Sequence, residues 1–223
     1  MSSENTLLHS GSGILETNRV LKNTYLLLGL TLLFSAATAG FALVTQARPL
    51  NIFVLLIGVY GLLFLTQALR NSVWGLVSTF AFTGFMGYTL GPILSYYLTT
   101  FSNGSQLIMT ALGATGIVFF ALSGYVITTR KDFSYMSGFL MGLGIIAMIT
   151  MIAGFFFQIP ALQLLISGLF ALFASGVILF QTSAIINGGE RNYIMATITL
   201  YVSIYNLFIS LLQLFGAFAG NRD

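Results

Sequence analysis

The chain has 223 residues, of which 57% are hydrophobic and only 6% are charged, and its mean hydropathy is +0.95. A soluble domain usually carries about 25% charged residues, so this composition indicates an integral membrane protein. The chain has no cysteine and a single histidine, His9 in the polar N-terminal segment, which excludes disulfides, thiolate metal sites and cysteine nucleophiles.

The few charged residues act as boundaries between long uncharged segments. They are Glu4, Glu16, Arg19, Lys22, Arg48, Arg70, Arg130, Lys131, Asp132, Glu190, Arg191, Arg222 and Asp223. Because a membrane-spanning helix needs about 20 mostly apolar residues, these charges, together with breaks that carry Pro, Asn or Gly, predict seven spans. The spans run Thr24 to Gln46, Leu50 to Leu69, Val73 to Leu98, Ser105 to Thr129, Phe133 to Phe157, Ala161 to Ile186 and Tyr193 to Ala219. The predicted fold class is an all-α integral membrane protein with seven transmembrane helices.

Residues 1–23 precede the first span and are polar, which predicts a flexible cytoplasmic tail, followed by a membrane domain over residues 24–219 and a short C-terminal tail over residues 220–223. A cleavable signal peptide is the alternative for the start, since Arg19 and Lys22 precede an apolar run and "ATA" at residues 37–39 has peptidase-site spacing. The polar region is long and the apolar run continues through Phe41, so we expect the first span to be retained.

Two of the breaks contain no charge. The stretch "TTFSNGSQ" after the third span is a polar turn, whereas "FQIPA" after the fifth has only one proline among apolar residues. Such a proline fits a kink as well as a turn. Roughly 50 uncharged residues from Phe133 to Gly189 are too many for one crossing, which favours a turn.

The distribution of Lys and Arg predicts the orientation. With the N-terminus inside, the inner face holds Arg19, Lys22, Arg70, Arg130, Lys131 and Arg191, and the outer face holds Arg48 and Arg222. Because cytoplasmic loops carry the excess of positive charge, we expect the N-terminus in the cytoplasm and the C-terminus in the periplasm. No loop is long enough to form a nucleic-acid site, so the net charge of +3 indicates contact with an anionic lipid bilayer.

Small residues recur three or four positions apart in several spans. They are Gly84, Gly87 and Gly91, then Gly138 and Gly142, then Ser167, Ala171 and Ser175. Such spacing lets helix backbones approach closely, and a substrate path lined by glycine is the alternative. Pro92 directly follows Gly91 and predicts a kink or interruption in the third span.

No Asp, Glu, Lys, Arg or His lies well inside any predicted span. Intramembrane proteases, proton relays and coupled transporters normally require such groups. Paired-histidine haem ligation is excluded by the single histidine, and both lysines lie at span ends, which excludes a retinal-type Schiff base. We therefore predict that the chain is not an enzyme and has no cofactor and no metal site.

Uncharged polar residues remain in the last two spans. Gln181 lies roughly 10 Å from the midplane on the cytoplasmic side, at 1.5 Å per residue. Ser203 and Asn206 lie three positions apart on one face of the seventh span, at a similar depth. A hairpin through "NGGERN" would bring the two spans together, so we predict a polar contact of Gln181, Ser203 and Asn206 facing the bundle interior.

Several ordered motifs resemble the Bax inhibitor family of seven-helix membrane proteins. They are "RVLKNTYLLLGLTLLFSA", "GLLFLT", "FAFTGFMGYTLGPIL", "YVITTRKDFS", "GVILFQTSAII" and "TITLYVSIYNLFISLLQLFG", which together cover nearly all of the chain from Arg19. The resemblance is strongest to the family's proteobacterial branch and implies localisation in the bacterial inner membrane.

The resemblance implies two functions. The proteobacterial branch implies a partner, the membrane-anchored ATP-dependent protease FtsH, whose activity it restrains. Other members are pH-sensitive calcium leaks in which two aspartates on the sixth and seventh helices share a proton. Those aspartates fall on Gln181 of "LFQT" and Ser203 of "LYVS", and because neither side chain ionises, the pair keeps hydrogen bonding but loses its titration.

Two hypotheses follow from the resemblance. In the preferred one, the chain modulates FtsH and its N-terminal tail, which contains "HSGSG", is a handle for the protease; a disordered end with no role is the alternative for that tail. In the other, the chain is a calcium or cation leak with Gln181 and Ser203 as a constriction. That hypothesis predicts a hydrated cavity with Asn206 and Thr182 among its lining groups.

Overall fold

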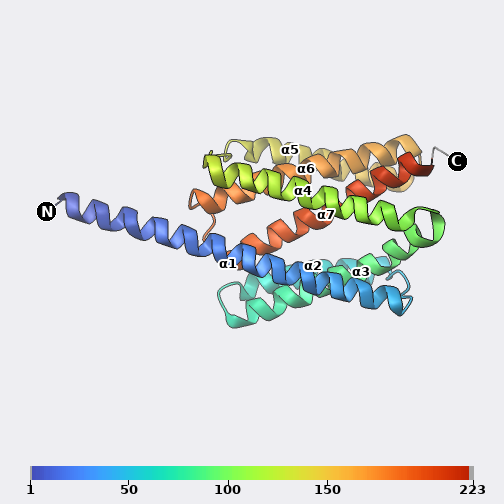
Figure 1. Ribbon diagram of the computed structural model, residues 1–223, viewed down its shortest axis with the longest axis horizontal. Coiled ribbons are helices and arrows are strands. Elements are labelled where there is room, and N and C mark those ends of the chain that lie inside the picture. The colour runs from blue at the N-terminus through green and yellow to red at the C-terminus, as the bar shows by residue number, and fades with distance from the viewer. Residues whose placement is uncertain (1, 221–223) are drawn as a thin grey trace.

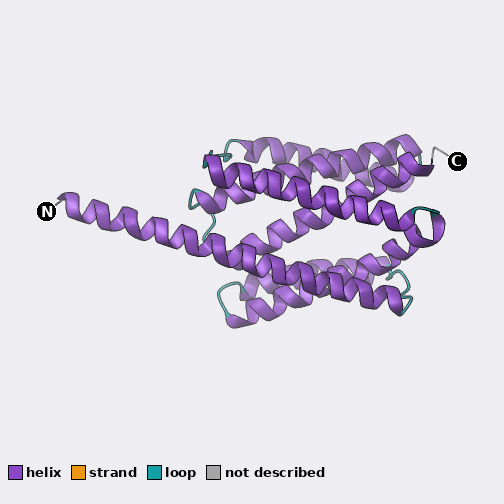
Figure 2. Ribbon diagram, in the orientation of Figure 1, coloured by secondary structure: helices purple, strands orange, loops and turns teal. Residues whose placement is uncertain are grey.

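The computed structural model describes the backbone of residues 2–220 and the side chains of residues 17–219, and this part of the chain forms seven α-helices (Figures 1 and 2). In chain order they are α1 (Ser2–Val44), α2 (Ile52–Leu69), α3 (Val73–Thr100), α4 (Gly104–Thr129), α5 (Met136–Phe156), α6 (Pro160–Ile186) and α7 (Tyr193–Gly220). Each helix contains a stretch long and apolar enough to cross a membrane. The predicted all-helical fold with seven membrane-length helices is therefore confirmed.

Most helix boundaries lie within a few residues of the predicted ones, and the uncharged break at "FQIPA" is a turn. There α5 ends at Phe156 and α6 begins at Pro160. Proline lacks a backbone N–H, but in the first turn of a helix that N–H would have no partner within the helix, so proline is tolerated there. The start of α1 differs, because the helix continues from Ser2 without a break at residue 23. No proline interrupts that segment, and the part of α1 with described side chains, Thr17–Val44, is long and apolar enough to cross a membrane. The flexibility of residues 1–23 stays a prediction.

Side-chain caps fix the starts of three helices. Asn51, Ser72 and Asn192 precede α2, α3 and α7, and each accepts a hydrogen bond from the backbone N–H two residues later, at 2.9, 3.3 and 3.0 Å. Such caps satisfy N–H groups that have no partner within the helix. The turn between α6 and α7 contains Gly188 at φ 76°, a left-handed conformation that glycine adopts without steric cost.

The helices form two groups of three with α7 between them (Figure 1). In the first group α1 and α2 both pack on α3, and in the second α4 and α5 both pack on α6. α7 crosses the middle and contacts α6, α4 and α1. In its most apolar window 61% of the α7 residues are buried, against 6% in α2. α7 is therefore the centre of the bundle, and α2 is a peripheral helix.

The glycines of α3 allow close packing against α1. A Cβ atom at Gly87 would lie within 3 Å of the Ser35 side chain, and one at Gly91 would overlap the side chain of Ala42. The predicted packing role of these two glycines is thus supported. A Cβ at Gly138 in α5 would meet no atom within 4 Å, so that position does not serve close packing within the chain.

α3 continues as a helix through Pro92, so the predicted interruption does not occur. Proline lacks the N–H that would bond to the preceding turn, and neighbouring helices tolerate this loss in a membrane bundle. The kink at Gly91 and Pro92 stays a prediction.

Gly87→Ala should destabilise the bundle, because the added methyl group requires α1 and α3 to separate. We expect a loss of about 1 to 3 kcal/mol in unfolding free energy, the usual range for overpacking. The matched control is Gly138→Ala, where the methyl group has open space and alanine favours helix. Thermal unfolding in detergent measures both variants, and equal melting temperatures for the two would contradict this packing.

Candidate functional site

Buried tyrosine hydroxyls connect α7 to the first group of helices. Tyr201 is 1% exposed, and its hydroxyl lies 2.6 Å from Ser35 Oγ on α1 and donates to the Thr83 carbonyl on α3 at 3.1 Å. One helical turn further, the Tyr205 hydroxyl lies 3.0 Å from Thr89 Oγ1 on α3. These bonds fix the position of α7 against α1 and α3. The sequence does not predict these bonds, because a tyrosine in an aromatic-rich span gives no indication of its partners.

Thr182 belongs to a second connection, between α6, α1 and α4. Its hydroxyl lies 3.3 Å from the Tyr25 hydroxyl and 3.5 Å from Ser123 Oγ. Thr182 is fully buried among these groups. It therefore joins three helices, and its place among the lining groups of a hydrated cavity stays a prediction.

Gln181 and Ser203 do not form a hydrogen bond with each other among the described residues. Ser203 Oγ donates to the Thr199 carbonyl at 2.8 Å, and Asn206 Nδ2 donates to the Val202 carbonyl at 2.9 Å. Each of these α7 side chains thus bonds to the carbonyl four residues earlier on its own helix. Gln181 is 6% exposed, and its Nε2 has no hydrogen-bond partner in the described part of the chain. Among the described residues no hydrogen bond therefore joins the predicted three, and their role as a gate stays a prediction.

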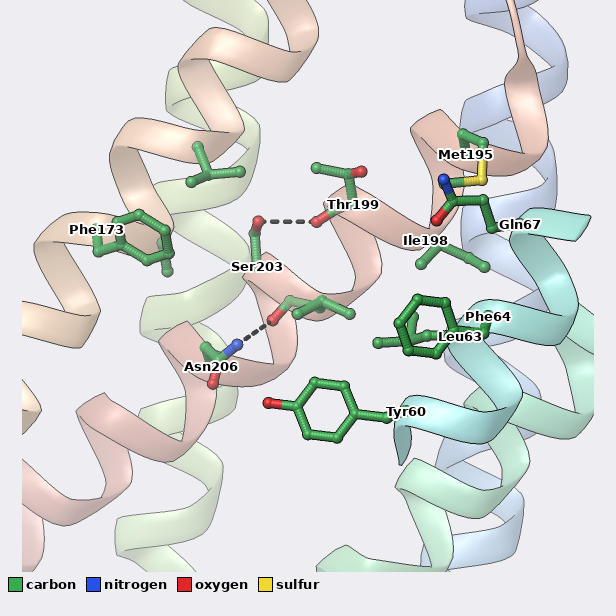
Figure 3. Close-up of a pocket in the computed structure, with 13 residues that line it drawn as sticks. Tyr60, Leu63, Phe64, Gln67, Phe173, Met195, Ile198, Thr199, Ser203 and Asn206 are labelled. Carbon is green, nitrogen blue, oxygen red and sulfur yellow. Dashed lines mark hydrogen bonds between the residues drawn. The ribbon is translucent and has the colours of Figure 1, made fainter. Parts of the chain in front are cut away.

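A crevice opens between α2 and α5, with α6 and α7 as its floor, and we name it the lateral crevice. It consists of three adjoining cavities of about 370, 640 and 700 Å³. The first lies between α2, α6 and α7 (Figure 3) and shares Phe173 and Thr199 with the second, which lies along α5. The first also shares Asn206 with the third, which lies nearer the C-terminal end of α7. The three cavities thus lie next to one another along α7.

A line of polar side chains follows α7 along the floor of the lateral crevice, and we name it the polar stripe. It consists of Thr199, Ser203, Asn206, Ser210 and Gln213, which all line the cavities. Their spacing of four, three, four and three residues puts all five on one face of the helix. Figure 3 shows the Tyr60 hydroxyl of α2 pointing toward Asn206, whereas Gln67 lies beside Met195 at the other end of the first cavity and Ser203 lies on the side of α7 toward Phe173.

The wall and floor of the crevice add further hydrogen-bonding groups. Ser167 Oγ on α6 donates to Gln213 Oε1 at 2.8 Å, and Gln163 Nε2 donates to the Gly154 carbonyl at 3.2 Å. Gln181 lines the second cavity. Among the described residues no three His, Asp or Glu side chains lie close enough together to hold a metal ion. The crevice therefore offers amides and hydroxyls for hydrogen bonding.

The turns at one end of the bundle are joined to each other and carry charge. Asn192 Nδ2 in the α6–α7 turn donates to the Arg70 carbonyl in the α2–α3 turn at 3.0 Å, and Ser183 Oγ accepts from the Phe133 N–H at 2.9 Å. The exposed Lys131 Nζ lies 5.7 Å from the centre of the Tyr125 ring. The nearby Tyr125 side chain raises the pKa of Lys131 from its ordinary value.

The chain is similar to a set of bacterial membrane proteins over nearly its whole length. The family model described as "Inhibitor of apoptosis-promoting Bax1" matches residues 17–220. An uncharacterized protein of Pseudomonas aeruginosa is 59% identical over 206 residues, which is 92% of each chain. The protein named "Modulator of FtsH protease YccA" of Escherichia coli K12 is 51% identical over 208 residues, 93% of this chain and 94% of that one. An "Uncharacterized membrane protein" of Vibrio cholerae is 46% identical over 93% of each chain.

The hydroxyl pair of Ser35 and Tyr201 should be coupled energetically. A double-mutant cycle with Ser35→Ala and Tyr201→Phe isolates that bond, and we expect a coupling of about 0.6 to 1.7 kcal/mol, as for other interhelical bonds in membranes. The measurement is unfolding free energy in mixed micelles. Tyr96→Phe is the control, because the Tyr96 side chain is exposed. Additive effects of the two substitutions would contradict the bond.

Proposed function

Because this chain belongs to the Bax inhibitor family, we propose that it modulates an FtsH-type membrane protease in the bacterial inner membrane. The observation that carries the proposal is the 51% identity, over 93% of the chain, to a protein named as a modulator of FtsH. Long insertions or missing segments would weaken an inference of function from this relative. The two chains match over 93% and 94% of their lengths, so any such segments are short. A relative named "Inner membrane protein YccA" supports the location.

The proposal makes the chain a regulator with no catalytic activity of its own. Modulation requires a surface that contacts the protease within the bilayer or at its face. The turns that carry Arg70, Lys131 and Arg191 lie at the same end of the bundle as the start of α7 (Figure 1). Because cytoplasmic loops carry the excess of positive charge, we place this end in the cytoplasm. The N-terminus then lies in the cytoplasm and the C-terminus in the periplasm.

We further propose the division of the chain into a cytoplasmic segment, a membrane domain and a short C-terminal tail. Residues 1–23 form the first, residues 24–219 the second and residues 220–223 the third. α1 extends past the other helices at the charged end (Figure 1), so its first part is within reach of a protease domain near the membrane surface. An energy-driven protease engages exposed chain ends that unfold easily, and this makes residues 1–23 a handle.

Co-reconstitution with purified FtsH in liposomes tests the proposal directly. The full chain should slow the degradation of a membrane substrate several-fold, and deletion of residues 1–19 should remove most of that effect if the segment is the handle. The measurement is the rate of substrate loss. An unchanged rate with the full chain, together with no physical association, would overturn the proposed function.

A calcium or cation leak is the second candidate function, and the polar stripe in the lateral crevice favours it. Five hydrogen-bonding side chains follow α7 through membrane depth, as an ion path requires. Gln181 and Ser203 stand where the resemblance places a titrating aspartate pair. Calcium prefers carboxylate oxygens, so an amide and a hydroxyl at these positions imply weak calcium binding.

Introducing Gln181→Asp together with Ser203→Asp should create a calcium flux that depends on pH. Two nearby carboxylates share a proton, so the flux should rise as the pH passes above their raised pKa and both groups ionise. Calcium efflux from loaded vesicles measures this, with Gln181→Asn and Ser203→Thr as the uncharged control. Absence of any pH-dependent flux in the aspartate variant would show that these two positions are not equivalent to the family's pair.

A further inference from the structure

We propose that the lateral crevice is the docking site for a membrane-spanning helix of the protease partner, which contacts the polar stripe of α7. The proposed occupant is one helix with small and hydrogen-bonding side chains along one face. This inference rests on the proposed function as a protease modulator and names the surface through which it acts.

The two walls of the crevice are peripheral helices that leave its floor uncovered. α2 packs mainly on α3, and α5 packs mainly on α6. Both walls present exposed apolar side chains to the membrane, whereas the floor presents the polar stripe. Elsewhere the outward face of α4 is apolar, with exposed Ile117 and Phe120, as contact with lipid requires. The crevice is thus a largely apolar groove at membrane depth in which a few hydrogen-bonding side chains of α7 lie along the floor.

The hydrogen bonds within the chain leave part of the polar stripe unused. Ser203 and Asn206 each donate one bond to their own helix, and Gln213 accepts one from Ser167. No hydrogen bond among the described residues engages the Asn206 Oδ1 or the Gln213 Nε2. Acyl chains have no groups that could bond to these atoms, so another membrane protein is the more favourable cover.

Gln181 provides an independent observation at the same place. Its side chain is 94% buried, since 6% is exposed, and it lines the second cavity with its Nε2 unpartnered. A buried amide without a partner is rare in folded proteins. Because this Nε2 is enclosed, an acceptor on the occupant of the crevice would satisfy it once the Gln181 side chain rotates toward the cavity.

The spacing of the polar stripe fits a helix as occupant. Thr199 and Gln213 are 14 residues apart, about 21 Å along the axis at 1.5 Å per residue, which is most of the hydrocarbon thickness. Alternation of three and four residues is the spacing at which two long helices meet along a common seam. Hydroxyl and amide side chains hydrogen-bond across such seams in membranes.

Photo-crosslinking in membranes that contain FtsH tests the proposal. A benzoylphenylalanine probe replaces Tyr60 on the crevice wall in one variant and Phe120 on the lipid face of α4 in the matched control. Both side chains are large, aromatic and exposed, so the probe is accommodated at each position. We expect crosslinks to the transmembrane segment of the protease from the first probe, in several-fold excess over the second. Equal yields, or crosslinks only to lipid or to a second copy of this chain, would overturn the proposal.

Substitutions that remove hydrogen bonding from the crevice test the same contact by function. Gln67→Leu and Asn206→Leu should each weaken the restraint of the protease several-fold, and Thr110→Leu on the exposed face of α4 should leave it unchanged. Gln67 is exposed on the wall, so its variant reports on docking even if Asn206→Leu fails to fold. If the unaltered chain restrains FtsH and both crevice variants restrain it equally well, docking in the crevice is wrong while the proposed function stands. If the unaltered chain has no effect on FtsH, the proposed function itself fails.

Discussion

A polar group in hydrocarbon has no water to bond, and this constraint governs every level of the structure. The backbone satisfies it by forming helices throughout the membrane-length segments, with Asn51, Ser72 and Asn192 capping three of the starts. Side-chain hydroxyls satisfy it by bonding to the carbonyl three or four residues earlier, as Ser203 does, or to another helix, as Tyr201 does. Polar side-chain atoms that bond neither to their own helix nor to another helix are therefore the candidates for contact with a partner.

α7 combines the two ways in which a membrane helix can use its surface. Its buried face carries Leu200, Tyr201 and Leu212 and is held by hydrogen bonds to α1 and α3. Its other face carries the polar stripe and forms the floor of the lateral crevice. Because the first face is fixed by packing, the second is presented at a constant position. A surface presented in this way suits a protein whose proposed work is contact with a partner.

If the proposed equivalence of Gln181 and Ser203 to the family's aspartate pair holds, the neutral side chains at these positions separate hydrogen bonding from pH sensitivity. Two carboxylates at these positions would change charge with pH and would draw cations, and an amide and a hydroxyl do neither at physiological pH. The surface keeps its donors and acceptors, which suit a neutral helix more than a calcium ion. This chemistry favours the regulator over the leak among the two proposed functions.

The sequence by itself determined the membrane class, the seven helices and the family, since each depends on composition, on the length of apolar runs or on ordered motifs along the chain. Even the turn at "FQIPA" followed from length alone, because the chain there is too long for one crossing. The sequence also located Gln181, Ser203 and Asn206 as unusual polar residues, but it placed them in one direct contact. Only the tertiary structure showed that Ser203 and Asn206 bond to carbonyls of their own helix, because the partner of a hydroxyl or amide depends on how neighbouring helices are rotated and spaced. The bonds of Tyr201, the position of Thr182 between three helices and the lateral crevice all arise from that arrangement, which no local pattern in the chain records.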